Sequence, residues 1–81
     1  MYPMADRLAE QCTQAAREGA DFPTIWETLL RRNELVVGPP VQSFEDERPH
    51  LDVRLSNGLC LRYSSGTNDF SLHRGRYHRA F

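Results

Sequence analysis

Apolar and polar residues alternate on both sides of a glycine-containing turn between residues 51 and 63. The apolar positions are Leu51, Val53 and Leu55 before the turn and Leu59, Leu61 and Tyr63 after it. A two-residue turn at Asn57-Gly58 would put the two apolar rows on opposite faces of a hairpin. A three-residue loop, 56–58, with Gly58 in the left-handed region pairs Leu55 with Leu59 and brings both rows to one face. The pattern therefore predicts an antiparallel hairpin with one dry face.

Two helices are predicted before this hairpin. From Pro3 to Glu18, apolar and small residues recur at three- and four-residue steps, and Gly19 ends the pattern. The positions concerned are Met4, Leu8, Cys12, Ala15 and Ala16. A second helix begins near Phe22, and its apolar stripe consists of Ile25, Trp26, Leu29 and Leu30. Residues 19–21 are thus a short link between two packed helices.

Local signals mark the two ends of the second helix. Pro23 suits a first helical turn, and Thr24 and Glu27 have the spacing of a capping box, in which hydroxyl and carboxylate satisfy free amides reciprocally. Two arginines, 31 and 32, fall where the helix dipole favours cations, and Asn33 is expected to end the helix in the left-handed conformation.

The remaining segments complete a sheet. Residues 41–44 are predicted as a short edge strand, and the acidic run 45–47 with the following Arg48-Pro49 as a solvated loop. A third main strand is expected from Asp69 to His73, with Phe70 and Leu72 on the dry face. The sequence predicts a two-layer α+β fold, in which an N-terminal helical hairpin packs on one face of a three- to four-stranded antiparallel meander.

Length and composition fit one small domain, which we place at residues 1–73. The chain has 81 residues, 40% of them hydrophobic and 26% charged, as in ordinary folded proteins. Residues 74–81 are expected to form a basic and aromatic C-terminal tail, either disordered or folded back on the acidic run.

Charge and cysteine content narrow the class of protein. A net charge of −1 argues against nucleic-acid binding by bulk electrostatics, and all ten basic residues are arginine, a bias associated with high-GC bacterial genomes. The two cysteines lack the dense spacing of a disulfide scaffold, and no apolar run reaches the roughly 20 residues of a membrane span. We expect a cytoplasmic bacterial protein with no membrane segment.

The polar face of the predicted sheet carries the candidate chemistry. If Tyr63 pairs with Phe70, the outward side chains form two rows, Arg54, Cys60 and His73 in one and Asp52, Arg62 and Ser71 in the other. A thiol beside imidazole and guanidinium is the minimum for a thiolate nucleophile, whereas solvated sheet faces commonly carry paired charges. We favour the second interpretation and predict no catalytic residue.

Metal and cofactor sites are not expected. The histidines and cysteines, at positions 50, 73, 78, 12 and 60, include no close pair at zinc-site spacing. Gly38-Pro39-Pro40 carries proline where a phosphate-binding loop needs amide donors.

The C-terminal segment 73–81 departs from the rest of the chain. It holds three arginines, two histidines, two aromatic residues and no acid. Guanidinium groups grip phosphates and aromatic rings stack on unpaired bases, so the segment suits single-stranded RNA. A solvated end without a ligand competes with this interpretation, and we favour it because chain termini are poorly ordered by default.

A helical hairpin, an antiparallel meander and an Arg/His/Tyr-rich end together resemble the RelE-type ribosome-dependent RNA-cleaving toxins in coarse order. The resemblance covers Arg62-Tyr63 and residues 73–77. It implies that Arg62 and Arg76 stabilise phosphate charge and that Tyr77 or His78 transfers a proton or stacks on a base. That family opens with a strand and its members tend to be strongly basic, whereas this chain opens with a predicted helix and is nearly neutral.

The leading expectation is a small non-enzymatic interaction or regulatory module that uses the exposed polar sheet face and the Arg/aromatic C-terminal tail. An RNA-binding or RNA-cleaving protein is the alternative. The partner is expected to be a protein, including a second copy of the chain through a sheet edge, or a single-stranded RNA. The candidate binding residues are Arg54, Arg62, His73, Arg74, Arg76, Tyr77 and Arg79.

Overall fold

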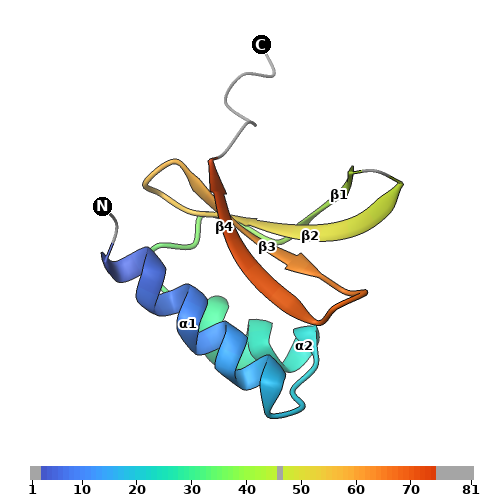
Figure 1. Cartoon of the computed structure of the whole chain (residues 1–81). Coiled ribbons are helices and arrows are strands. Elements are labelled where there is room, and N and C mark those ends of the chain that lie inside the picture. The colour runs from blue at the N-terminus through green and yellow to red at the C-terminus, as the bar shows by residue number, and fades with distance from the viewer. Residues whose placement is uncertain (1–2, 46, 75–81) are drawn as a thin grey trace.

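The protein has two layers, one of helices and one of sheet, in a computed structural model that describes residues 3–45 and 47–74. The elements in chain order are the helices α1 (Pro3–Arg17), α2 (Phe22–Ile25) and η1 (Trp26–Leu30) and the strands β1 (Val41–Glu45), β2 (Arg48–Arg54), β3 (Leu59–Ser64) and β4 (Asp69–Arg74). The strands form one antiparallel sheet in the order β1-β2-β3-β4, and the helices lie on one side of it (Figure 1). The predicted α+β class and meander are confirmed.

The β2–β3 hairpin has the register expected from its apolar alternation. Val53 pairs with Leu61, and the amide of Leu55 donates to the carbonyl of Leu59 at 2.9 Å. Gly58 closes the three-residue loop with φ of 88°, a conformation that glycine adopts without steric cost. Because this loop sets the pairing, both apolar rows face the helices.

Strands β3 and β4 pair with Tyr63 opposite Phe70, the register on which the expected rows of the outer face depend. The rings of these two residues lie 5.0 Å apart between centroids, and that of Phe22 from α2 lies 5.1 Å from Tyr63. Asn68, in the turn before β4, accepts from the Tyr63 hydroxyl at 2.6 Å and donates to the carbonyl of Ala16 at 3.1 Å. These contacts fasten the β3–β4 turn to the end of α1.

Helix α1 buries one stripe against the sheet and ends where expected. The buried positions are Ala5, Leu8, Cys12 and Ala16, whereas Met4, expected on this stripe, is 58% exposed. Ala5 takes the inward position in the first turn, so the apolar character of Met4 was misleading. Gly19 has φ of 101° and, with Ala20, donates back to carbonyls of the last turn, which is a Schellman ending.

The predicted capping box at the start of the second helix is wrong. Asp21 is the N-cap, and its carboxylate accepts from the amide of Thr24 at 3.0 Å. These hydrogen bonds to Thr24 hold the pKa of Asp21 below its ordinary value. Because the helix begins at Phe22, Thr24 lies inside it, and Glu27 pairs with Arg31 at 3.0 Å instead.

A π-helical turn, not predicted from the sequence, follows directly in η1. The amide of Arg31 donates to the carbonyl of Trp26 at 2.7 Å, which is the five-residue step of a π-helix. Ile25 and Leu30, five positions apart, are both fully buried. Five residues span well over one α-helical turn, so the wider turn brings both side chains to the core.

Asn33 does not end the helix in the left-handed conformation, contrary to the prediction. It is not among the residues with positive φ, and its side-chain oxygen accepts from the amide of Leu35 at 2.9 Å, a local turn that competes with helix. Before β1 begins, the chain already lies along the end of β2. Val36 pairs with Leu55, and the amide of Val37 donates to the carbonyl of Arg54 at 2.9 Å.

The edge strand β1 was predicted, but its hairpin with β2 is tighter than expected. Arg48 and Pro49, expected in a loop, are the first residues of β2 and pair with Glu45 and Phe44. Glu47 turns the chain with φ of 64°. Proline is tolerated near the start of a strand, where the loss of one amide donor is least disruptive.

No helix in the described segments has the length and apolar character needed to cross a membrane.

Candidate functional site: the outer face of the sheet

The sheet face that turns away from the helices is called the outer face below. The described register brings together the two rows expected there, Arg54 with Cys60 and His73, and Asp52 with Arg62 and Ser71. Cys60 and His73 are therefore neighbours on adjacent strands. This face gathers most of the polar side-chain contacts of the sheet.

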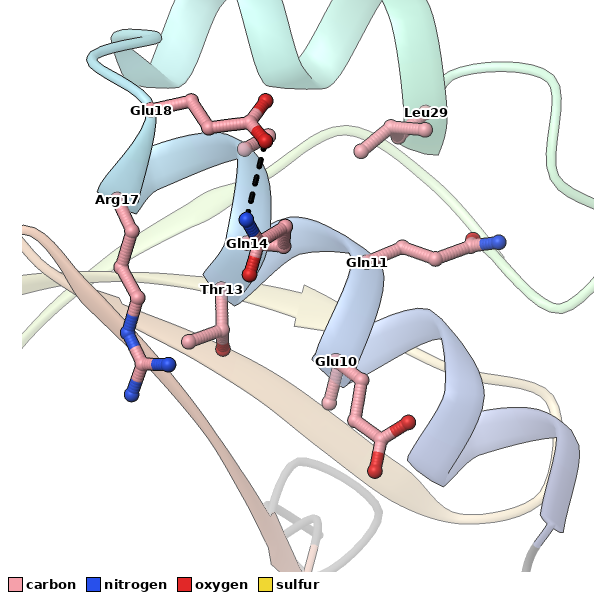
Figure 2. A pocket seen from close by; sticks show the side chains of 9 residues that line it. Glu10, Gln11, Thr13, Gln14, Arg17, Glu18 and Leu29 are labelled. Atoms are coloured by element: carbon pink, nitrogen blue, oxygen red, sulfur yellow. Dashed lines mark hydrogen bonds between the residues drawn. The ribbon is translucent and has the colours of Figure 1, made fainter.

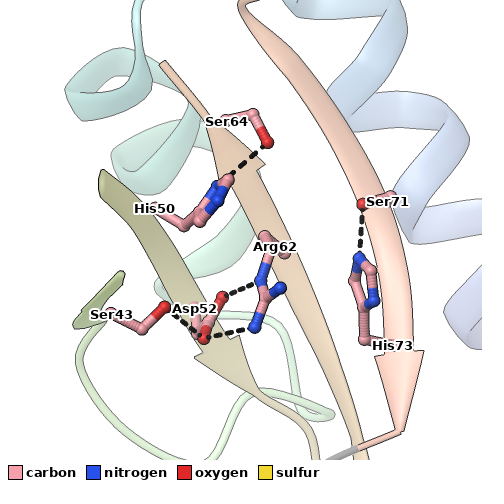
Figure 3. A network of polar contacts seen from close by, with 7 residues as sticks. All are labelled: Ser43, His50, Asp52, Arg62, Ser64, Ser71 and His73. Carbon is pink, nitrogen blue, oxygen red and sulfur yellow. Dashed lines mark hydrogen bonds and ion pairs between the residues drawn. The ribbon is translucent and has the colours of Figure 1, made fainter. Parts of the chain in front are cut away.

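Asp52 and Arg62 form an ion pair at the centre of the outer face (Figure 3). The guanidinium donates through Nε to Oδ1 at 2.9 Å and through Nη2 to Oδ2 at 3.3 Å. The Ser43 hydroxyl donates to Oδ2 at 2.9 Å. We expected this pair to be solvated, but the structure shields it from water. Asp52 is 1% exposed, and the Arg62 side chain is 19% exposed. Central strands carry flanking side chains on both sides, so their outward residues are covered laterally.

Two further polar contacts flank the ion pair in Figure 3. His50 Nδ1 lies 3.1 Å from the Ser64 hydroxyl, and His73 Nε2 lies 2.8 Å from the Ser71 hydroxyl. Ser43, His50 and Ser64 form a third row, because Ser43 pairs with His50 and His50 with Ser64. The sequence prediction missed this row; extending the alternation of β2 back to Arg48 would have placed His50 on it.

Both cysteines lack the solvent access of a reactive thiolate. Cys60 is 2% exposed, although its neighbour His73 is open to solvent, and reactive cysteines need access to substrate. Cys12, in the core beneath α1, has its pKa raised by burial to about 12. Its thiol therefore stays protonated at neutral pH.

The structure divides the predicted binding residues among three locations. Arg54, Arg62 and His73 share the outer face. Arg74 pairs with Leu59 at the end of β4, so the strand alternation places it on the helix-facing side. The predicted tail residues Arg76, Tyr77 and Arg79, with His78, lie outside the described residues.

Histidine, cysteine and acidic side chains do not cluster in metal-binding groups of three or more anywhere in residues 3–45 and 47–74. Two adjoining hollows lie where β2 runs past the end of β3. One, of about 430 Å³, is lined by Arg48, Pro49, His50, Ser64, Ser65, Gly66 and Thr67. The other, of about 250 Å³, is lined by Gln42, Pro49, His50, Leu51, Tyr63 and Ser65.

A larger hollow of about 790 Å³ follows α1 and reaches Leu29 of η1. Figure 2 shows Arg17, Thr13 and Glu10 on one side of the helix and Gln11 on the other, so these side chains do not converge. Gln14 donates to Glu18 at 3.0 Å, one turn along the same helix. The arrangement is that of a solvated helix surface beside a groove.

No protein-family model matches the chain, and neither the curated proteins nor the solved structures include a match to it.

Proposed function

We propose that the protein is a small non-enzymatic interaction module that binds a protein partner through the outer face of its sheet. The observation that carries the proposal is the ordered polar network on a face that the helices leave uncovered, with Asp52 held by Arg62 and Ser43 at its centre. The arginine-only basic composition and the two free cysteines support placing the protein in a bacterial cytosol.

The internal satisfaction of this network supports binding over catalysis. A general acid or base must be able to exchange its proton with a substrate, whereas both oxygens of Asp52 already accept hydrogen bonds within a shielded ion pair. Polar side chains that are already held in place lose little conformational freedom when a partner docks on them. The exposed Ser71 and His73, at the rim of the network, supply hydrogen-bonding groups to that partner.

The same ion pair makes a protein partner a better fit than RNA. Arg62 would have to leave a nearly buried carboxylate to grip a phosphate, and an unpaired buried charge is strongly destabilising. RNA binding remains the second candidate because His73 and Arg74 are consecutive exposed residues at the end of β4, directly before the arginine-rich segment. In that case the segment 75–81, and not Arg62, would supply most of the phosphate contacts.

A matched pair of bulky substitutions tests the proposal. Ser71→Tyr adds a ring to the exposed rim of the outer face, and Gln11→Tyr adds the same ring to the exposed surface of α1. Tagged full-length protein is used to capture partners from the cells that produce it. One protein retained by the parent chain and by Gln11→Tyr but lost with Ser71→Tyr is the expected result. Equal capture by both variants would contradict an interface on the outer face.

Amide NMR separates the two candidates. Spectra of the labelled protein are recorded at low salt alone, with a mixed short single-stranded RNA, and again after residues 75–81 are deleted. The protein-binding proposal predicts no RNA-dependent shifts in either chain. Shifts that centre on His73 and Arg74, fade as salt rises and vanish with the deletion would instead establish the RNA candidate.

A further inference from the structure

We propose that two copies of this chain associate through the outer edges of their β1 strands, giving a two-fold symmetric dimer in which Phe44 of each copy packs on the Gln42–Leu51 surface of the other. The inference uses the edge of the sheet and not its outer face, so it does not depend on the proposed function. The two surfaces lie side by side, and the same protein can use both.

Strand β1 is an open edge of the sheet. It is the first strand in the order β1-β2-β3-β4, and among the described residues only β2 pairs with it. At the opposite edge α1 packs against β4, whereas the β1–β2 hairpin extends away from the helices (Figure 1). Val41–Glu45 contains neither proline nor lysine, the residues that commonly block edge pairing.

An exposed aromatic side chain, Phe44, lies on this edge. Phe44 is 67% exposed, the largest exposure among the exposed large hydrophobic residues of the described chain. It pairs with Pro49, and Gln42 pairs with Leu51, so all four lie on the helix-facing side of the sheet, beyond the helices. A lone exposed aromatic ring needs no explanation, but one on an unpaired strand edge adds an apolar contact to any pairing there.

A hollow that could receive an apolar side chain lies next to Phe44. The cavity of about 250 Å³ includes Gln42, Leu51 and Tyr63 in its lining. These three residues form one row across β1, β2 and β3 on the helix-facing side. Gln42, the β1 member of this row, therefore brings the lining of the hollow to the β1 edge.

The register follows from placing the two-fold axis at Ser43, the centre of the strand. Antiparallel pairing about this axis sets Ser43 opposite its own copy and Phe44 opposite the Gln42 of the other chain. Each Phe44 ring then lies over the Gln42–Leu51 row and the mouth of the hollow. Because the contact is made twice by the same two patches, the interface is closed and self-complementary.

Charge favours the antiparallel arrangement and a second copy as the occupant. Parallel pairing would set Glu47 of both copies at the same end of the interface, whereas antiparallel pairing carries each Glu47 to the Gly38 end of the other strand. The guanidinium of Arg54 lies at that end, since a Cβ added to Gly38 would approach its Nη2 to 3.0 Å. Glu47 of one copy thus lies at the end of the strand where the other copy carries the Arg54 cation.

Sedimentation equilibrium of the full chain over a range of concentrations tests the dimer. We expect the parent chain to dimerise and Phe44→Ser to raise the dissociation constant at least about 100-fold, because two apolar rings lose their burial in each dimer. Met4→Ser is the matched control, since Met4 is also 58% exposed but lies in the first turn of α1, away from the β1 edge. A parent chain that stays monomeric at millimolar concentration, or a dimer that survives Phe44→Ser, would overturn the proposal.

Cysteine cross-linking tests the register. With oxidised glutathione as the oxidant, Ser43→Cys is expected to form a covalent dimer across the axis, whereas Gln42→Cys, opposite Phe44 of the other copy, is not. Cys12 and Cys60 are buried and give the background in the parent chain. Cross-linking of Gln42→Cys without that of Ser43→Cys would refute this register, and amide spectra of all variants verify that the fold is intact.

Discussion

The two faces of the sheet are held by different kinds of force. On the helix-facing side, Val53, Leu61 and Phe70 pack among apolar side chains of α1 and α2 without needing a particular partner. On the outer face, Asp52 and Arg62 are shielded from bulk water and held by specific hydrogen bonds between their oxygen and nitrogen atoms. Both faces belong to the same strands, so the alternation of a single sequence builds them together.

The difference lies in how each face tolerates change. Apolar packing is proportional to the area buried, so a smaller apolar residue loses part of the stabilisation and keeps the rest. A shielded ion pair does not degrade gradually, because removing one partner leaves the other as an uncompensated charge. On the inner face, the loss of stability is therefore expected to follow the side-chain volume that a substitution removes. On the outer face, it is expected to depend on whether the substitution removes a charged partner.

The largest loss of stability is expected at the centre of the inner face. Leu61 has no exposed surface, and Leu61→Ala should lower the free energy of unfolding by about 4 kcal/mol through lost transfer energy and a cavity. Leu72→Ala, at a half-buried position on the edge strand β4, should lower it by less. Urea unfolding measures both. Equal losses would mean that the core is not centred on β3.

The ion pair tests the outer face. Arg62→Ala should lower the free energy of unfolding by about 3 kcal/mol, because it leaves the Asp52 carboxylate shielded and without its bidentate partner. Replacing both residues, as Asp52→Ala with Arg62→Ala, should restore part of this loss. A double variant whose loss equals the sum of the two single losses would show that the ion pair contributes no coupling energy.

The inner layer also makes a prediction in alkaline solution. Burial raises the pKa of the Cys12 thiol from 9.0 to about 12, so the unfolded chain loses this proton at lower pH than the folded chain does. The stabilisation is fully present below pH 9 and is lost as pH rises towards 12, by about 2 kcal/mol at pH 10.5.

The raised pKa of Tyr63, caused by burial and by Asp21, acts in the same direction at higher pH. Cys12→Ala removes the thiol titration, so unfolding measured from pH 8 to 10.5 should show a shallower decline in that variant. An identical decline in both chains would assign the pH dependence to groups other than Cys12.

The alternation of apolar and polar residues predicted which side chains share a face of the sheet, because side chains along a strand follow a strict two-residue period. Once the loop 56–58 was given three residues, the β2–β3 register followed, with Arg54 beside Cys60 and Asp52 beside Arg62. The placement of His73 beside Cys60 did not follow, because it depends on the separate β3–β4 turn and was expected only on the condition that Tyr63 pairs with Phe70. The same reasoning could not find the shielding of Asp52, since burial on an uncovered face depends on where a long arginine side chain lies.

The start of the second helix was harder to predict from the sequence, because two nearby residues are both suited to the N-cap position. Asp21 and Thr24 are both good N-cap residues, and only the position of Phe22 in the core decides between them. The π-turn of η1 likewise follows from burying Ile25 and Leu30 together, a requirement that no local pattern states. Tertiary packing therefore overrides local propensity in this segment.

The smallest expected effect concerns Gly58, the residue that sorts side chains between the two faces. Gly58 has φ of 88° and open space where the methyl group of an alanine would lie, so Gly58→Ala costs only backbone strain, about 1 kcal/mol in the free energy of unfolding. Gly66→Ala is the matched control, because Gly66 also has open space but no positive φ. Urea unfolding should show a loss for the first variant and almost none for the second. Equal losses would mean that loss of glycine in a turn, and not the left-handed conformation at Gly58, weakens the hairpin. A shift of β3 by one residue against β2 would lower the free energy of unfolding by much more than this strain, because it would carry Arg62 into the core and Leu61 to the outer face.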